Sequence, residues 1–260
     1  MYADALLLEM LTDADVAYAL RVTESAPDED LSGAVRSLRA DPPVLAAMLE
    51  DERLQPAVLN DPHILLKVSP YFFFSILLRR ARRELRNRSF TAEWLAPRRR
   101  LPVFDAPRIA DTLEDTARVH YLADLLGSFT SVARSPGDRG VPVPSGRRFH
   151  ELNLNDLRRL RHTAYAAQRF ALDRRLGDVA LFLAGVFPDS AHGAAELDEW
   201  EGESQTRYRS AARAPEARRC GLRETLDGLA DDLHPARKAL NFVADRFLQP
   251  IRCEWFALGA

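Results

Sequence analysis

The sequence predicts an all-α protein, a multi-helix bundle of roughly nine to twelve helices with one long loop rich in Pro and Gly. Apolar residues recur at spacings of three and four over most of the chain, which is the period of a helix with one buried face. Strand-like alternation of Val, Ile and Thr is missing, apart from a few residues around Val141 and Val143 that prolines interrupt. We therefore expect no sheet.

The first half of the chain carries the clearest helix start. Short helices are expected in residues 3–60, and then Ser69 can cap a helix whose first residue is Pro70. The aromatic run at 71–74 is apolar on every side, which indicates burial, and arginines occupy the outer faces farther along. This helix should begin in the core and end in solvent.

Further helices are predicted on both sides of the loop. Residues 105–126 form one long apolar stripe, and Gly127 is placed to end that helix. After the loop, Asn153 or Asn155 can cap a helix that Gly177 would close, and Asp178 can cap the next one.

The last third of the chain begins with an acidic stretch, residues 189–203, which indicates a solvated helix or loop. From Leu222 to Phe247 the apolar residues again alternate by four and three. Pro235 should kink or split this final helix.

The loop also gives the expected domain organisation. Residues 1–132 would be an N-terminal helical layer with the Arg-bearing helices, 133–150 a loop or linker, and 151–260 a C-terminal helical subdomain packed on the first. The two cysteines match neither a disulfide framework nor a zinc spacing, so no cofactor is predicted and a cytoplasmic location is expected. The apolar run from Ile64 to Leu78 is too short to span a membrane comfortably and contains Lys67 and Pro70.

An arginine-rich segment is the strongest candidate for a binding site. Between Arg79 and Arg100 only Glu84 and Glu93 oppose nine arginines. Arginine forks bind carboxylates and phosphates, and Trp94 could stack on a base. The competing interpretation is a solvated helix end paired with neighbouring carboxylates, such as those at 189–203. The candidate residues are Arg79, Arg80, Arg82, Arg83, Arg86, Arg88, Trp94, Arg98, Arg99 and Arg100.

Two other clusters carry groups that could do chemistry. Asp227, Asp231 and His234 follow one another by four and three residues, so they could hold a metal on one helix face; a hydrated, salt-bridged face explains the same spacing. His120 and Asp124 lie one turn apart and could form an acid–base pair, although a buried histidine with a satisfied hydrogen bond is the simpler account.

The usual nucleophile, nucleotide and zinc-protease signatures do not occur in the sequence. The leading hypothesis is therefore a non-enzymatic helical interaction or regulatory protein whose arginine-rich surface docks an acidic protein surface. The first alternative is binding of nucleic acid or another polyanion through Arg79–Arg100. The second is a helical-bundle enzyme that uses Asp227, Asp231 and His234.

Overall fold

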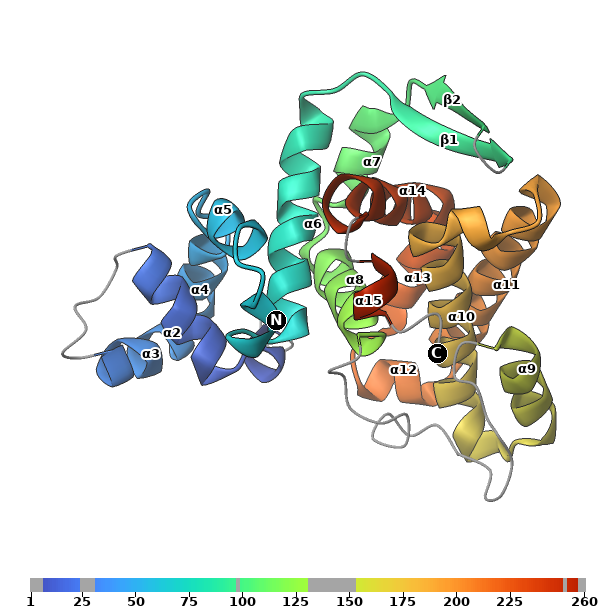
Figure 1. Cartoon of the computed structure of the whole chain (residues 1–260). Helices are drawn as coiled ribbons and strands as arrows, with labels where there is room; N and C mark the ends of the chain where they lie inside the picture. Colours follow the sequence, from blue (N-terminus) through green and yellow to red (C-terminus); the bar gives the residue numbers. More distant parts are fainter. Residues whose placement is uncertain (1–6, 24–30, 97–98, 131–152, 250–251, 257–260) are drawn as a thin grey trace. The chain divides into compact units, whose positions relative to one another are not determined.

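The structure is a computed structural model that describes residues 7–23, 31–96, 99–130, 153–249 and 252–256. The described residues form fourteen α-helices, eleven of them with seven residues or more, and one two-stranded sheet (Figure 1). The predicted all-α class is confirmed. The predicted loop at 133–150 lies outside the described residues. No helix in the described ranges is long and apolar enough to cross a membrane.

Contacts group the chain into two compact units, each assembled from segments that are distant in sequence. Unit 1 comprises Met1–Asn87, Leu113–Ala133 and Arg246–Ala260, and unit 2 comprises Arg88–Thr112 and Arg134–Asp245. This grouping differs from a division at the predicted loop, because residues 88–112 pack with the C-terminal helices and the last residues pack with the N-terminal ones.

Unit 1 is built around a helix with a fully apolar first half. Phe72, Phe73 and Phe74 of this helix, α6, are at most 2% exposed. Trp255 packs edge-on against Phe73 at 5.0 Å between ring centroids, so the C-terminal residues complete this core. The helices of the unit are α2 (Asp13–Val22), α3 (Leu31–Arg39), α4 (Pro42–Met48), α5 (Leu54–Leu59), η2 (Ile64–Leu66), α6 (Pro70–Arg86), α8 (Thr116–Ser128) and α15 (Arg252–Trp255).

The start of α6 is as predicted. Ser69 Oγ accepts a hydrogen bond from the backbone N–H of Phe72, and Pro70 is the first helical residue, where its missing N–H costs nothing. The carboxylate of Asp15 in turn accepts hydrogen bonds from both the N–H and the hydroxyl of Ser69. Helix α2 therefore fixes the position at which α6 enters the core.

The prediction of one long helix over 105–126 is wrong, because the chain breaks after Thr112. Helix α7 (Ala106–Thr112) ends there, and α8 begins after Asp115, whose carboxylate accepts hydrogen bonds from the N–H groups of Ala117 and Arg118. This local cap competes with helix continuation. Gly127 does not end α8 either; a Cβ there would lie 3.3 Å from the backbone nitrogen of Tyr71, so the glycine permits close packing on α6.

Unit 2 contains the longest helices and the sheet. Helices α10 and α11 lie side by side over much of their length, and α14 packs on α10 (Figure 1). A π-helical turn, η5 (Ala244–Leu248), follows α14. The elements are β1 (Thr91–Ala96), β2 (Arg99–Val103), α7, α9 (Leu154–Thr163), α10 (Ala166–Val186), η4 (Pro188–Ser190), α11 (Ala194–Arg213), α12 (Pro215–Arg219), α13 (Arg223–Asp231) and α14 (Leu233–Val243).

The sequence predicts one helix that ends at Gly177 and a second that begins at Asp178. In the structure, the first helix is the shorter α9, which Asn153 caps as predicted, and the chain on both sides of Gly177 forms the single helix α10. Gly177 lies inside α10 because the buried ring of Tyr208 occupies the place of a side chain; a Cβ at this position would be 2.7 Å from Tyr208 Cε1. Asp178, predicted as a cap, instead accepts a hydrogen bond from the Tyr208 hydroxyl at 2.9 Å. Close packing, rather than helix termination, explains this glycine.

The predicted split near Pro235 is confirmed. Helix α13 ends at Asp231 and α14 begins at Leu233, with Pro235 in the first turn of α14, where backbone N–H groups have no partner within the helix. The acidic stretch at 189–203 forms the 3-10 turn η4 and the first half of α11.

The expectation of no sheet is wrong at one place, because strands β1 and β2 form an antiparallel hairpin. Thr91 pairs with Val103 and Glu93 with Leu101, and a bulge follows Trp94. Part of the arginine-rich segment lies within this hairpin. Its sequence has little strand character, so contacts with residues distant in sequence must hold it.

Candidate functional site

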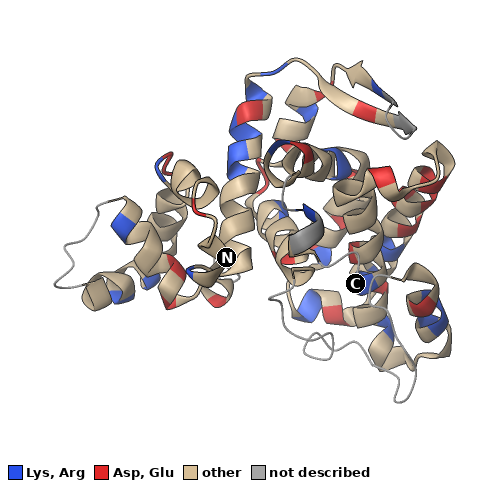
Figure 2. Cartoon of the chain, viewed as in Figure 1, with Lys and Arg blue, Asp and Glu red and all other residues tan. Residues whose placement is uncertain are grey.

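The predicted arginine-rich segment divides between the two units. Unit 1 holds the arginines of α6, which together with Arg246 form a surface that we call the arginine face; Figure 2 shows basic residues gathering on the C-terminal half of α6. Arg88 and the hairpin residues belong to unit 2. The arginine face consists of Arg79, Arg80, Arg82, Arg83, Arg86 and Arg246.

Glu50, at the end of α4, is the main acceptor of the arginine face. Its carboxylate lies 2.9 Å from Arg79 Nε and 2.8 Å from Arg82 Nη2, and its backbone carbonyl accepts from Arg83 Nη1 at 2.7 Å. Arg79 is only 3% exposed, so the expectation that every arginine of this helix faces solvent is wrong for it. Burial lowers the pKa of Arg79, and the negative charge of Glu50 opposes that effect.

The remaining members pair nearer the surface. Arg86 Nη2 lies 2.6 Å from Glu114, and both Arg80 and Arg246 contact Glu84, at 2.6 and 3.2 Å. Burial alone would raise the pKa of Glu84, but Arg80 and Arg246 outweigh it and the pKa lies below its usual value. Six arginines thus share three glutamates, and the side chains of Arg80, Arg86 and Arg246 are 39, 57 and 53% exposed.

The hairpin part of the segment is also engaged within unit 2. Arg100 donates to Asp245 at 2.7 Å, and its guanidinium lies 3.8 Å from the centroid of the Trp94 ring, which covers one face of that indole. Arg88 lies over Phe242 at 5.0 Å. One face of the Trp94 ring is therefore already occupied by Arg100. Arg98 lies outside the described residues, and so does the side chain of Arg99.

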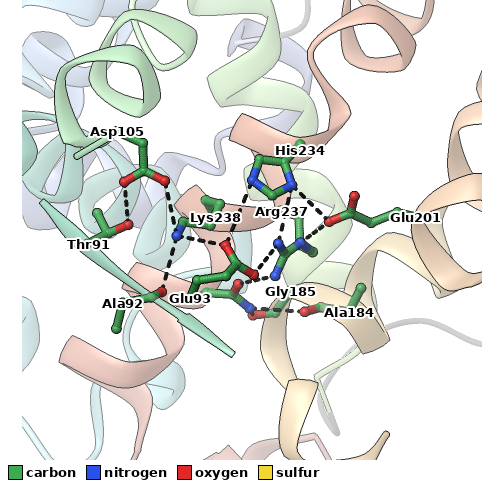
Figure 3. A network of polar contacts seen from close by, with 11 residues as sticks. Thr91, Ala92, Glu93, Asp105, Ala184, Gly185, Glu201, His234, Arg237 and Lys238 are labelled. Atoms are coloured by element: carbon green, nitrogen blue, oxygen red, sulfur yellow. Dashed lines mark hydrogen bonds and ion pairs between the residues drawn. The ribbon is translucent and has the colours of Figure 1, made fainter. Parts of the chain in front are cut away.

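A buried cluster of charges joins the hairpin to the helices of unit 2, and we call it the anchor cluster (Figure 3). Strand β1 contributes Glu93, the chain before α7 contributes Asp105, and α11 contributes Glu201. Helix α14 contributes three neighbouring residues from its first two turns, and each ion pair of the cluster involves one of them. The cluster consists of Glu93, Asp105, Glu201, His234, Arg237 and Lys238.

Lys238 sits at the centre of the anchor cluster with a side chain 1% exposed. Its Nζ donates to Glu93 Oε2 at 2.9 Å and to the carbonyl of Ala92 at 3.2 Å, and lies 3.0 Å from Asp105 Oδ2. Two of the three ammonium donors thus form hydrogen bonds, and the carboxylate of Asp105 is a second ion-pair partner. Asp105 also accepts from the Thr91 hydroxyl at 2.6 Å, which ties the start of β1 to the same point.

Arg237 and His234 complete the cluster. Arg237 donates to Glu93 Oε1 at 2.6 Å and to Asn241 at 2.9 Å, and its guanidinium is ion-paired with Glu201. His234 Nδ1 lies 3.3 Å from Glu201 Oε1, and its Nε2 lies 3.8 Å from Glu93 Oε2. Three carboxylates therefore surround two buried cations and one half-exposed imidazole.

The acidic members are held in their charged form. Burial alone would raise the pKa values of Glu93 and Glu201, but the neighbouring cations outweigh it and both pKa values lie below the usual range. For Glu93 the opposing groups are Arg237 and Lys238, and for Glu201 they are His234 and Arg237. Desolvation offsets much of the attraction in such pairs, whereas loss of one partner leaves an uncompensated charge.

The predicted metal residues Asp227, Asp231 and His234 are engaged separately. Asp227 lies 3.8 Å from Arg223, and Asp231 lies 3.3 Å from Arg209, both near the surface of unit 2. His234 instead joins the anchor cluster. The helix break between Asp231 and Leu233 interrupts the face that the three residues were expected to share.

Glu93, Asp105 and His234 do bring three ligand-type atoms within 4.8 Å of one another. The ammonium of Lys238 contacts both carboxylates, so a cation already holds the place between them. A metal ion bound there would have to displace this buried lysine. The geometry therefore favours an anchoring role for these residues.

A pocket of about 310 Å³ in unit 2 opens beside His234. Nδ1 of the imidazole contacts Glu201 and Arg237, whereas Nε2 lies 3.8 Å from Glu93 Oε2, beyond hydrogen-bond distance. The pocket is lined by Arg108, Asp198, Glu201, Gly202, Gln205, Asp231, Leu233, His234 and Pro235.

The third candidate, His120 with Asp124, lies on α8 in unit 1. His120 is completely buried in unit 1, and its Nδ1 lies 2.5 Å from the hydroxyl of Tyr71 at the start of α6. The hydrogen bond at Nδ1 is the kind of contact that a buried histidine on an apolar stripe is expected to make. A role in packing accounts for it.

Several residues of both sites escape prediction from the sequence. Glu50 and Glu114, which pair with the arginines, lie about thirty residues from them, and Lys238 lies 145 residues from Glu93. One signal was present: Lys67 and Lys238 are the only lysines in a chain otherwise supplied with arginine. Lys238 also lies one helical turn after His234, on the polar stripe of residues 222–247.

Three comparisons of the chain with known proteins give no match. No family model, no curated protein and no solved structure matches it. Function is therefore argued from the geometry of the arginine face and of the pocket in unit 2.

Proposed function

We propose that this chain is a non-enzymatic helical interaction protein, located in the cytoplasm, that docks an acidic partner on the arginine face. The observation that carries the proposal is the imbalance of charge there: in the described part of the chain, the ion pairs of six arginines go to three glutamates. Shared glutamates hold the guanidinium groups in place without neutralising them. A carboxylate-rich partner would complete the pairing with bidentate hydrogen bonds.

The buried and exposed members have different roles in this proposal. Arg79 is enclosed with Glu50, so its removal would destabilise the fold and would not report on docking. Arg86 and Arg246 are more than half exposed, so solvent reaches one side of their ion pairs with Glu114 and with the more buried Glu84. Exposed pairs of this kind contribute about 0–1 kcal/mol, so these two residues can be changed without unfolding the chain.

The test is a double charge reversal, Arg86→Glu with Arg246→Glu. Its matched control is Arg159→Glu with Arg219→Glu, which makes the same change in net charge at side chains that are 83 and 76% exposed in unit 2. The probe is a fluorescein-labelled oligo-glutamate of about twelve residues, titrated at low and at physiological salt and followed by fluorescence anisotropy.

The proposal predicts that the Arg86/Arg246 reversal weakens binding at least about tenfold, while the control changes it by less than about threefold. Equal weakening in both variants would mean that only net charge matters and would refute a defined arginine face. An oligothymidylate titrated in parallel gives the alternative outcome. If it binds more tightly than oligo-glutamate and loses affinity steeply with salt, the face is a nucleic-acid site instead.

A further inference from the structure

The pocket beside His234 lies wholly within unit 2, and we call it the α7–α11 pocket. Its lining comes from α7, from one face of α11 and from the start of α14, and both α7 and α11 pack on α14. The volume of about 310 Å³ is at the lower end of the range of small-molecule sites, about 300–1,000 Å³. The space therefore fits a small solute and is too small for a folded partner.

A glycine in the wall of this pocket has no explanation in packing. Glycine is less favourable than alanine inside a helix, so it needs a reason there. At Gly177 of α10 the reason is close packing, because a Cβ would lie 2.7 Å from the Tyr208 ring. At Gly202, in the middle of α11, a Cβ would meet no atom within 4 Å. The missing side chain leaves the backbone of α11 open at the pocket, where a ligand can approach it closely.

Two of the carboxylates that line the pocket are already paired. Glu201 of α11 is ion-paired with Arg237. Asp231, at the end of α13, lies 3.3 Å from Arg209. Both arginines stand outside the pocket lining, and their positive charges offset the two carboxylates. These pairs therefore leave no net charge for a ligand to neutralise.

The pocket keeps one unpaired charge of each sign. The side chains of Arg108 on α7 and Asp198 on α11 form no ion pair within the described part of the chain, and both residues are exposed. A guanidinium binds a carboxylate through two parallel hydrogen bonds, and a carboxylate accepts hydrogen bonds from an ammonium. A ligand with one negative and one positive group would satisfy both residues, whereas a singly charged ligand would satisfy only one.

The rest of the lining suits the body of such a ligand. Leu233 and Pro235, at the start of α14, supply apolar surface. Gln205 donates from Nε2 to the carbonyl of Ala230 at 2.8 Å, which fixes the orientation of the amide. The Oε1 atom of Gln205 has no partner among the described residues and remains an acceptor in the pocket wall.

We propose that the α7–α11 pocket binds a small zwitterion of the amino-acid class, whose carboxylate pairs with Arg108 and whose ammonium pairs with Asp198. Gly202 lets the ligand lie against the backbone of α11, and Leu233 and Pro235 contact its apolar part. This site goes beyond the proposed docking function, because it shares no residue with the arginine face.

The test begins with thermal unfolding of the full chain in the presence of the standard amino acids, β-alanine and γ-aminobutyrate, each at about 10 mM, because a ligand that binds only the folded chain raises Tm. The strongest binder is then titrated by isothermal calorimetry beside two of its analogues, one without the ammonium and one without the carboxylate. We expect at least one amino acid to raise Tm by at least about 2 °C, and each analogue to bind at least about tenfold more weakly.

Three variants assign this binding to the pocket. Arg108→Gln and Asp198→Asn each remove one charge, and Gly202→Leu puts a side chain into the open space while favouring the helix. Each should weaken binding at least about tenfold. The matched control is Glu199→Gln, which removes a charge from the neighbouring position of α11, where the side chain is 61% exposed and lies outside the pocket lining. It should change affinity by less than about threefold.

Circular dichroism verifies the helical content of all four variants. The inference is wrong if no amino acid raises Tm, or if either analogue binds as tightly as the zwitterion, which would identify a site for simple cations or simple anions. Equal weakening in the Glu199 control would contradict it too, because net charge alone would then explain the effect. The Arg86/Arg246 reversal should keep the amino-acid response, so failure of the docking proposal is recognised separately.

Discussion

At the scale of single residues, buried charge decides where the hairpin lies. Lys238 is 1% exposed, yet its ammonium has oxygen acceptors on β1 and just before α7. Transfer of an unpaired ammonium to such a site would cost several kcal/mol. The oxygen atoms of the hairpin therefore stabilise the buried lysine, and the lysine in turn holds the hairpin in place. The same reasoning applies to Arg79 and Glu50 in unit 1.

The two lysines of the chain offer a matched pair for testing this. Lys238→Met leaves Glu93 and Asp105 facing each other without the cation between them, and we expect it to lower the free energy of unfolding by about 3–5 kcal/mol. Lys67→Met removes an exposed partner of Asp61 and should change stability little. Urea unfolding measures both. Equal midpoints for the two variants would mean that the ammonium does not support the hairpin.

The anchor cluster also predicts how stability depends on pH. The folded-state pKa values of Glu93 and Glu201 lie below their usual values, so the unfolded chain binds more protons in the interval between. Their contribution is complete above the unfolded-state pKa of about 4.3 and is lost as the pH falls through the lower folded-state values.

Urea midpoints measured between about pH 6 and about pH 3 should therefore fall on acidification. Glu93→Gln is less stable than wild type at neutral pH, because Arg237 and Lys238 lose a charged partner. The gap between the two proteins should narrow in acid, where the wild-type carboxyl is protonated too. Parallel curves for the two proteins would contradict this account.

At the scale of elements, caps and prolines in the sequence predict the helix starts and breaks that short-range interactions determine. The Ser69–Pro70 start of α6, the Asn153 cap of α9 and the break before α14 follow from caps and proline, which act within one turn. The helix predicted over 105–126 does not form as one element, because the cap at Asp115 begins a new helix within the apolar stripe. The β1–β2 hairpin could not be predicted, because its main partners lie about 145 residues farther along the chain.

Substitution of two glycines by alanine distinguishes the effect of side-chain packing on stability from the effect of helix propensity. Gly177→Ala in α10 would bring a Cβ to 2.7 Å from the buried Tyr208 ring, and we expect overpacking to cost about 1–3 kcal/mol despite the better propensity of alanine. Gly202→Ala in α11 meets no atom within 4 Å and should stabilise the chain by up to about 1 kcal/mol. Thermal unfolding of both variants checks the opposite signs. A stabilised Gly177→Ala would show that α11 packs less closely on α10.

At the scale of the whole molecule, the sequence predicts where the charged segment lies, but not which of its arginines are buried or paired. Nine arginines between Arg79 and Arg100 mark a basic region, whereas burial and pairing depend on Glu50, Glu84, Glu114 and Asp245, which the fold brings to them. Likewise, the spacing of Asp227, Asp231 and His234 could not show that a helix break divides them. Sequence patterns predict which faces are polar, and only tertiary contacts decide which charges remain available.

Hydrogen–deuterium exchange with and without the oligo-glutamate probe tests the arginine face most directly. The proposal predicts slower exchange in peptides that cover the last turns of α6 and the residues of η5, with no change over α9, which carries exposed arginines of its own. Protection of α9 equal to that of α6, or no protection of α6 at saturating probe, would contradict docking on the arginine face.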